Sequence, residues 1–157
     1  MRKLIAIALV AAMLTSCDEK VDDRVLVATG LPMDGLQQVP TKQVAGNGTI
    51  DAYYNRNLHT LYYTVKWNSL TGNAIAGFGL YGPAAPKFRG GLLQSFSGFP
   101  AAQAGTYSGT VFIDGVVLKE QELLLGEYYI SIPTAANPVS ATSGGEIRGQ
   151  VAGLKSP

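Results

Sequence analysis

From Val25 to the C-terminus the chain consists of short runs rich in β-branched and aromatic residues, broken by Gly, Pro, Asn and Asp. No run of ten or more residues repeats its apolar positions with the 3.6-residue period of a helix. The pattern predicts an all-β domain, an antiparallel β-sandwich or Greek-key barrel of about eight strands. We expect strands over Val25–Gly30, Gly48–Tyr54, Leu58–Trp67, Ala74–Tyr81, Gly91–Phe96, Gly105–Ile113, Glu127–Ile132 and Glu146–Ala152.

The third of these runs shows the strand pattern most clearly. Every second position from Leu61 to Trp67 is apolar, and the positions between them are mostly polar. This is the alternation of an antiparallel strand with one face on the core, so we expect Trp67 to be buried. One short helix is predicted over Leu118–Leu125, with Gly126 as its C-terminal stop.

The N-terminal segment has the order of a secretory leader. Arg2 and Lys3 precede a mostly apolar stretch over residues 4–14, too short to span a bilayer, and Thr15 and Ser16 lead to Cys17. The end of this segment resembles a bacterial lipoprotein signal, in which the cysteine is acylated and the leader is cut before it. The alternatives are a plain secretory signal with a chance cysteine, or a buried cysteine without a role in anchoring.

The lipoprotein resemblance divides the chain into four parts. Residues 1–16 form the signal peptide, 17–24 the lipidated Cys17 and an acidic tether, 25–153 the β-domain and 154–157 a short tail. We expect a lipid-anchored protein of the bacterial cell envelope, at the outer membrane or cell surface rather than the inner membrane. The leaflet stays open, because acidic residues after such a cysteine resemble an export signal in some bacteria and a retention signal in others.

Composition excludes several functions. The 12 basic and 11 acidic residues are too evenly balanced for nucleic-acid binding. A single Cys and a single His, His59, rule out an intrachain disulfide and any multi-histidine metal site. The sequence Gly77–Gly82 fits a dinucleotide-binding pattern, but prolines follow it where that site needs a helix. We therefore expect no catalytic residues, no cofactor and no metal.

A binding surface is predicted around the loop Gly82–Gly90, because loops on a rigid β-scaffold often carry function. Its candidate residues are Tyr81, Lys87, Phe88 and Arg89. The adjacent tyrosines 53–54, 62–63 and 128–129 place one ring of each pair on the outer face of its strand, where it could bind a partner or only cover the sheet.

Glu146 and Arg148 are two residues apart in the last predicted strand, so their side chains point to the same face. Gly145 and Gly149 beside them allow another backbone to approach closely. We interpret these four residues as a structural motif held by an ion pair, and a ligand site is the alternative.

Several segments in a fixed order carry a family resemblance. They are Gly35–Pro40, Leu61–Val65 with Trp67 and Leu70, Gly82–Ala84, Gly105–Thr110, Leu123–Tyr129 and Gly144–Gln150. Together they resemble a chordin-type (CHRD) domain over residues 25–151. The resemblance implies an immunoglobulin-like or superoxide-dismutase-like β-sandwich with a binding role. Histidines typical of the family are replaced here by Gly79, Tyr81 and Pro133, so no metal site or dismutase chemistry is carried over.

These observations predict a non-catalytic envelope lipoprotein whose β-domain binds a protein or a glycan, with the membrane as its other partner through the lipid. One alternative is a purely structural envelope protein. Another is a diverged metal-binding or hydrolytic domain that uses carboxylates such as Asp51, Asp114 and Glu146.

Overall fold

The computed structural model describes residues 24–157. The predicted signal peptide and Cys17 lie outside the described residues. The elements are β1 (Val25–Asp34), β2 (Asn47–Asn55), β3 (Thr60–Asn68), β4 (Gly79–Gly82), β5 (Gly91–Ser95), β6 (Gly105–Phe112), α1 (Glu120–Leu124), β7 (Tyr128–Ile132), β8 (Val139–Ser140), β9 (Ser143–Gly144) and β10 (Ile147–Val151).

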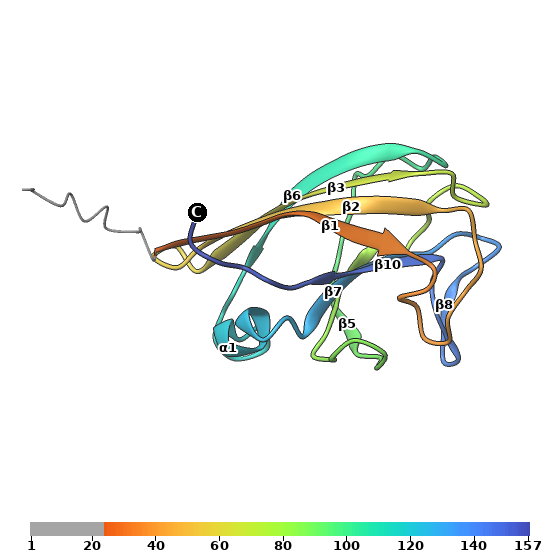
Figure 1. The fold of residues 1–157 in the computed structure, drawn as a ribbon. Coiled ribbons are helices and arrows are strands. Elements are labelled where there is room, and N and C mark those ends of the chain that lie inside the picture. Colours follow the sequence, from red (N-terminus) through yellow and green to blue (C-terminus); the bar gives the residue numbers. More distant parts are fainter. Residues whose placement is uncertain (1–23) are drawn as a thin grey trace, which may run out of the picture.

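Eight strands form one antiparallel sheet in the order β5-β4-β7-β10-β1-β2-β3-β6, and β8 and β9 form a separate hairpin. The sheet curls so that β1, β2, β3 and β6 face β10, β7 and β5 (Figure 1). Its two edges approach each other, since the Tyr107 hydroxyl in β6 donates to the Ser97 carbonyl just after β5 at 3.0 Å. The expected all-β, antiparallel class with one short helix is confirmed, with the two layers joined in a single, nearly barrel-shaped sheet.

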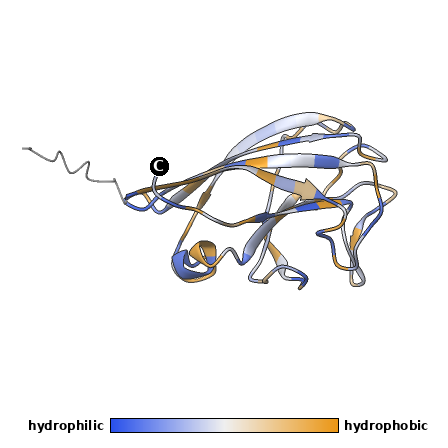
Figure 2. Ribbon diagram, viewed as in Figure 1, coloured by the Kyte–Doolittle hydropathy of each residue, from blue (hydrophilic) through white to orange (hydrophobic). Residues whose placement is uncertain are grey.

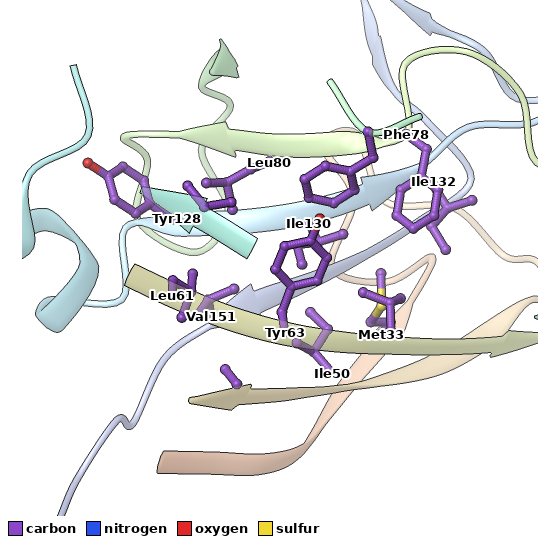
Figure 3. Packing of buried hydrophobic residues seen from close by; sticks show 14 of the residues in the cluster. Met33, Ile50, Leu61, Tyr63, Phe78, Leu80, Tyr128, Ile130, Ile132 and Val151 are labelled. Atoms are coloured by element: carbon purple, nitrogen blue, oxygen red, sulfur yellow. The ribbon is translucent and has the colours of Figure 1, made fainter. Parts of the chain in front are cut away.

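The core lies between the two layers. Ile50, Leu61 and Tyr63 point from β2 and β3 toward Leu80 and Ile130 of the opposite layer (Figure 3). Full burial of such a side chain stabilises the fold by about 1.5–3 kcal/mol. Hydrophobic and hydrophilic residues are interleaved along the outer strands (Figure 2), as expected for strands with one face in water.

The β2–β3 hairpin follows the sequence pattern. Leu61, Tyr63, Val65 and Trp67 are buried, which confirms Trp67 as a core residue. Its indole N–H donates to the Ala102 carbonyl at 3.1 Å. His59 lies in the turn before β3 with a φ of 48°.

Two strand boundaries differ from the sequence prediction by more than two residues, and one hairpin is new. β1 continues past Gly30 to Asp34 through a bulge between Ala28 and Leu31. The strand expected over residues 74–81 is reduced to β4, because a turn that closes from the Phe78 N–H to the Ile75 carbonyl precedes it. The hairpin of β8 and β9 was not expected. Within residues 24–157, no helix is long and apolar enough to cross a membrane.

Candidate functional site

The strand β7 is buried on both faces. Tyr128, Ile130 and Ile132 belong to the core, whereas Tyr129 and Ser131 point to the outer side of the sheet and are buried as well. The loop from Gly82 to Gly90 covers Tyr129, whose hydroxyl contacts the Gly90 N–H at 3.1 Å. The prediction of an outward, exposed tyrosine on this strand is therefore wrong.

The other two tyrosine pairs behave as the alternation predicts. Tyr54 and Tyr63 are buried, while Tyr53 and Tyr62 remain partly exposed on the outer face of the sheet. These two outer rings meet edge to face, with centroids 5.7 Å apart. They lie directly opposite each other in the β2–β3 register.

An aromatic and cationic stack lies beneath the loop. The rings of Tyr81 and Tyr129 stack at 5.4 Å, and the Arg148 guanidinium lies 3.5 Å from the centroid of the Tyr129 ring. Tyr81, predicted on the exposed binding surface, is instead only 4% exposed, because it forms part of this stack. Burial, together with the nearby Tyr129, raises the pKa of Tyr81 to about 12, so its phenol is neutral at physiological pH.

Arg148 is fully buried and holds the loop from below. Its guanidinium donates to the Phe88 carbonyl at 2.6 Å and to the Gln150 side-chain carbonyl at 2.8 Å. The Gln150 amide in turn donates to the Ala84 carbonyl at 2.9 Å. Burial lowers the pKa of Arg148, yet an arginine stays protonated in proteins.

Glu146 does not pair with Arg148, so the predicted ion pair is wrong. Its carboxylate accepts hydrogen bonds from the Thr71 N–H at 2.7 Å, the Thr71 hydroxyl, the Thr134 hydroxyl at 2.6 Å and the Asn137 amide at 3.3 Å. Lys42 joins this network by donating to Asn137. The physical reason is position, because Glu146 precedes β10 and the two-residue alternation holds only within a strand.

These hydrogen bonds favour the ionised form of the Glu146 side chain. Burial would raise the pKa of its carboxyl, but the hydrogen bonds from Thr134, Thr71 and Asn137 outweigh it and hold the pKa below its usual range. The carboxylate therefore ties two loops together as an anion.

The glycines of the motif serve close packing. Gly145 has a φ of +109°, and a Cβ on Gly149 would lie 2.4 Å from the Met33 side chain. Gly145, Glu146, Arg148 and Gly149 thus each contact a different neighbouring segment and do not form one connected site.

The loop itself presents two side chains outward. Phe88 is 68% exposed and Lys87 is exposed with a φ of 72°. Arg89, predicted to be part of the surface, is engaged with the β8–β9 hairpin through the carbonyls of Ser140, Ala141 and Ser143 at 2.6 to 3.2 Å. The loop is consequently fixed from below and from one side.

A cavity of about 480 Å³ opens beside the loop. Two segments form its walls and the outer side of β10 forms its floor; the lining residues are Leu36, Gln37, Gln38, Val39, Pro40, Thr41, Pro86, Lys87, Arg148 and Gln150. Two of these carry a positive charge and none is acidic. The segment 36–41 was missed as a site in the sequence, where it served only as part of the family resemblance.

The sequence model of the CHRD domain matches residues 30–151. The chain belongs to the CHRD-domain family. No curated protein and no solved structure gave a significant match to it. The cavity is therefore interpreted only from the residues of this chain that line it.

The CHRD fold here leaves little room at one of the positions where the resemblance places a histidine. A Cβ on Gly79 would lie 2.4 Å from the Gln94 carbonyl oxygen of the neighbouring strand. A histidine at that position would thus require β4 and β5 to separate. Among residues 24–157, no group of three His, Cys, Asp or Glu side chains is placed to hold a metal ion.

The carboxylates considered for hydrolysis have different partners. Asp51 contacts Lys66 and the Gly30 N–H, and Asp114 accepts the backbone N–H groups of residues 116–118. Glu146 is engaged in its own network. The structure therefore does not join these three residues in one site.

Proposed function

We propose that this CHRD-domain protein is a non-catalytic binding module of the bacterial cell envelope, held there by lipid on Cys17. The order of basic, apolar and small residues before Cys17 supports the anchor. Two or more acyl chains hold a protein stably on a membrane.

The observation that carries the binding role is the cavity beside the Gly82–Gly90 loop. A concave site with apolar walls and a few polar groups is the usual form of a binding pocket. Its volume suits a sugar residue or a short peptide side chain. Because Lys87 and Arg148 line it without a carboxylate, the part of the partner that enters it is expected to be anionic.

The binding test compares the acylated wild-type chain with two variants. Lys87→Glu reverses the charge at the rim, and Thr41→Trp narrows the entrance from the opposite wall. Lys155→Glu makes the same change of charge on the exposed C-terminal segment and serves as the control. The probes are arrays of uronic-acid glycans and acidic peptides with their neutral counterparts.

We expect selective binding of acidic probes, weakened about tenfold or more by Lys87→Glu and by Thr41→Trp but not by Lys155→Glu. A probe bound equally by all four proteins would place its site elsewhere and overturn the assignment. Absence of any binding would favour the alternative of a purely structural envelope protein.

The anchor has its own test. Intact-mass analysis of the membrane fraction is expected to show a chain that begins at an acylated Cys17. Cys17→Ala should release the protein from the membrane fraction, and an unmodified wild-type chain would refute the anchor.

A further inference from the structure

The strand register brings several chain segments to one end of the barrel. Val25 pairs with Asn55, Asn55 with Thr60, and Thr60 with Phe112, so the first residue of β1 lies in one row with the β2–β3 turn and the end of β6. The start of β1, this turn and α1 lie at the same end in Figure 1. We call it the N-terminal end of the barrel.

Large apolar side chains are exposed at this end. They stand on the β2–β3 turn, on the last residue of β6, on the turn that follows it and at the end of α1, and each is more than half exposed: Leu58, Phe112, Val116, Val117 and Leu125. The first two segments are joined by a hydrogen bond of 2.7 Å from the Ile113 N–H to the His59 carbonyl. Gathered apolar residues of this size mark an interaction surface.

The carboxylates at the N-terminal end of the barrel already have hydrogen-bond or ion-pair partners. Asp114 binds the N–H groups of residues 116–118, and these bonds hold its pKa below the usual range. Glu120 is 2.9 Å from the Arg56 guanidinium, and Glu122 is 3.2 Å from the Lys119 ammonium. These carboxylates are thus engaged within the protein, and the exposed apolar side chains stand beside exposed polar ones such as Asn57, His59 and Lys119.

The length of the segment between Cys17 and Arg24 limits what can cover this surface. Only six residues lie between Cys17 and Arg24, the first described residue, so the two are seven Cα-to-Cα steps apart. Fully extended, they span about 25 Å. If Cys17 carries acyl chains in a bilayer, the N-terminal end of the barrel cannot move far from the lipid headgroups.

We propose that the N-terminal end of the barrel docks on the lipid surface to which Cys17 is anchored, with Leu58, Phe112, Val116 and Val117 in the headgroup region. This inference rests on the proposed anchor. Apolar side chains on a tethered protein favour such an interface, because the tether already holds them close to it. The contact is apolar, so it should not depend on salt.

Docking would also orient the binding cavity. The segment 36–41 follows Asp34, the last residue of β1, and a strand of ten residues is about 30 Å long. The cavity wall formed by this segment therefore lies at the end of β1 away from the membrane, where a partner can reach it.

The test uses the full-length gene product purified from membranes, with Val117→Cys or Thr142→Cys introduced and labelled with a polarity-sensitive dye. Thr142 lies in the exposed β8–β9 turn and is the matched control. Each protein is placed in phosphatidylethanolamine and phosphatidylglycerol vesicles that contain nitroxide lipids. Intact mass determines whether Cys17 is acylated.

We expect the dye at residue 117 to shift to shorter wavelength and to be quenched by the nitroxide lipids, at low and high salt alike, while the dye at residue 142 stays unchanged. Adding Leu58→Asp and Val116→Asp should abolish the shift at residue 117 without releasing the protein from the vesicles. Acylated protein without a shift, or with equal shifts at both positions, overturns docking but leaves the anchor. An unacylated Cys17 overturns both.

Discussion

Replacing Glu146 by glutamine removes one charge from a fully buried site and leaves the size of the side chain unchanged. The carboxylate has four donors around it, whereas an amide offers one oxygen and one NH₂ group. The hydroxyls of Thr71 and Thr134 can rotate to accept from the new NH₂. The Thr71 N–H and the Asn137 NH₂ group cannot accept a hydrogen bond. The introduced NH₂ group therefore faces another donor in either orientation, the Thr71 N–H in one and the Asn137 NH₂ group in the other.

The size of the effect follows from these bonds. A buried donor left without an acceptor costs about 1–3 kcal/mol, and hydrogen bonds to a charged group are worth about 1 kcal/mol more than neutral ones. Relief from burying a charge offsets part of this loss. We expect Glu146→Gln to lower the free energy of unfolding by about 3 kcal/mol at pH 7.

The effect should depend on pH with a definite sign. Because the pKa of Glu146 is lowered in the folded protein, the unfolded chain takes up the proton first as the pH falls. The stabilisation by the carboxylate is therefore complete above its unfolded pKa of about 4.3 and is lost as the pH falls through the folded pKa. Glutamine binds no proton, so the difference between wild type and variant should shrink below about pH 4.

Urea unfolding at pH 7 and pH 3, followed by the fluorescence of the buried Trp67, measures both quantities. Glu127→Gln, a change at a half-buried carboxylate outside this network, is the control and should change stability by less than about 0.5 kcal/mol. Equal stability of wild type and Glu146→Gln at pH 7 would refute the reasoning. A gap of the same size at both pH values would refute the pKa argument.

Two further predictions concern the loop. Arg148→Met keeps an apolar stem but loses the bond to the Phe88 carbonyl, so we expect faster amide hydrogen exchange in the loop and a loss of about 2–3 kcal/mol in urea unfolding. Unchanged exchange would show that Arg148 does not fix the loop. Gly90→Ala places a Cβ 2.4 Å from the Gly82 Cα and should cost about 1–3 kcal/mol in thermal unfolding, whereas Gly91→Ala meets nothing within 4 Å and should be nearly neutral. Equal melting temperatures for the two variants would contradict this packing.

The sequence predicted those strands that have one face on the core and one in water. The alternation from Leu61 to Trp67 identified the buried residues of β3, and the same rule placed Tyr53 and Tyr62 outside. The rule failed for Tyr129, because the loop that covers it is 39 residues away in the chain. A local pattern records which residues share a face of a strand, but it does not record what later packs on that face.

The candidate site was only partly visible for the same reason. Lys87 and Phe88 were predicted because they lie in a Pro- and Gly-rich loop, which is a local criterion, and of the two only Lys87 lines the cavity. The opposite wall of the cavity, residues 36–41, comes from a segment about fifty residues earlier, and the two meet only in the folded sheet. Glu146 and Arg148 were recognised as structural, but their partners in distant loops could not be read from their spacing.

Different side chains fix the loop and face solvent from it. Arg148, Gln150 and Arg89 bind carbonyl groups of the loop or of the hairpin beside it, so they fix its backbone. Lys87 and Phe88 point away from these contacts and into solvent. Under the proposed binding role, substitutions at Lys87, which lines the cavity, should therefore change what its rim binds while leaving the free energy of unfolding within about 0.5 kcal/mol of wild type. Because a loop held in place loses little freedom when a partner binds, affinity in this fold can be adjusted at the rim without rebuilding the scaffold.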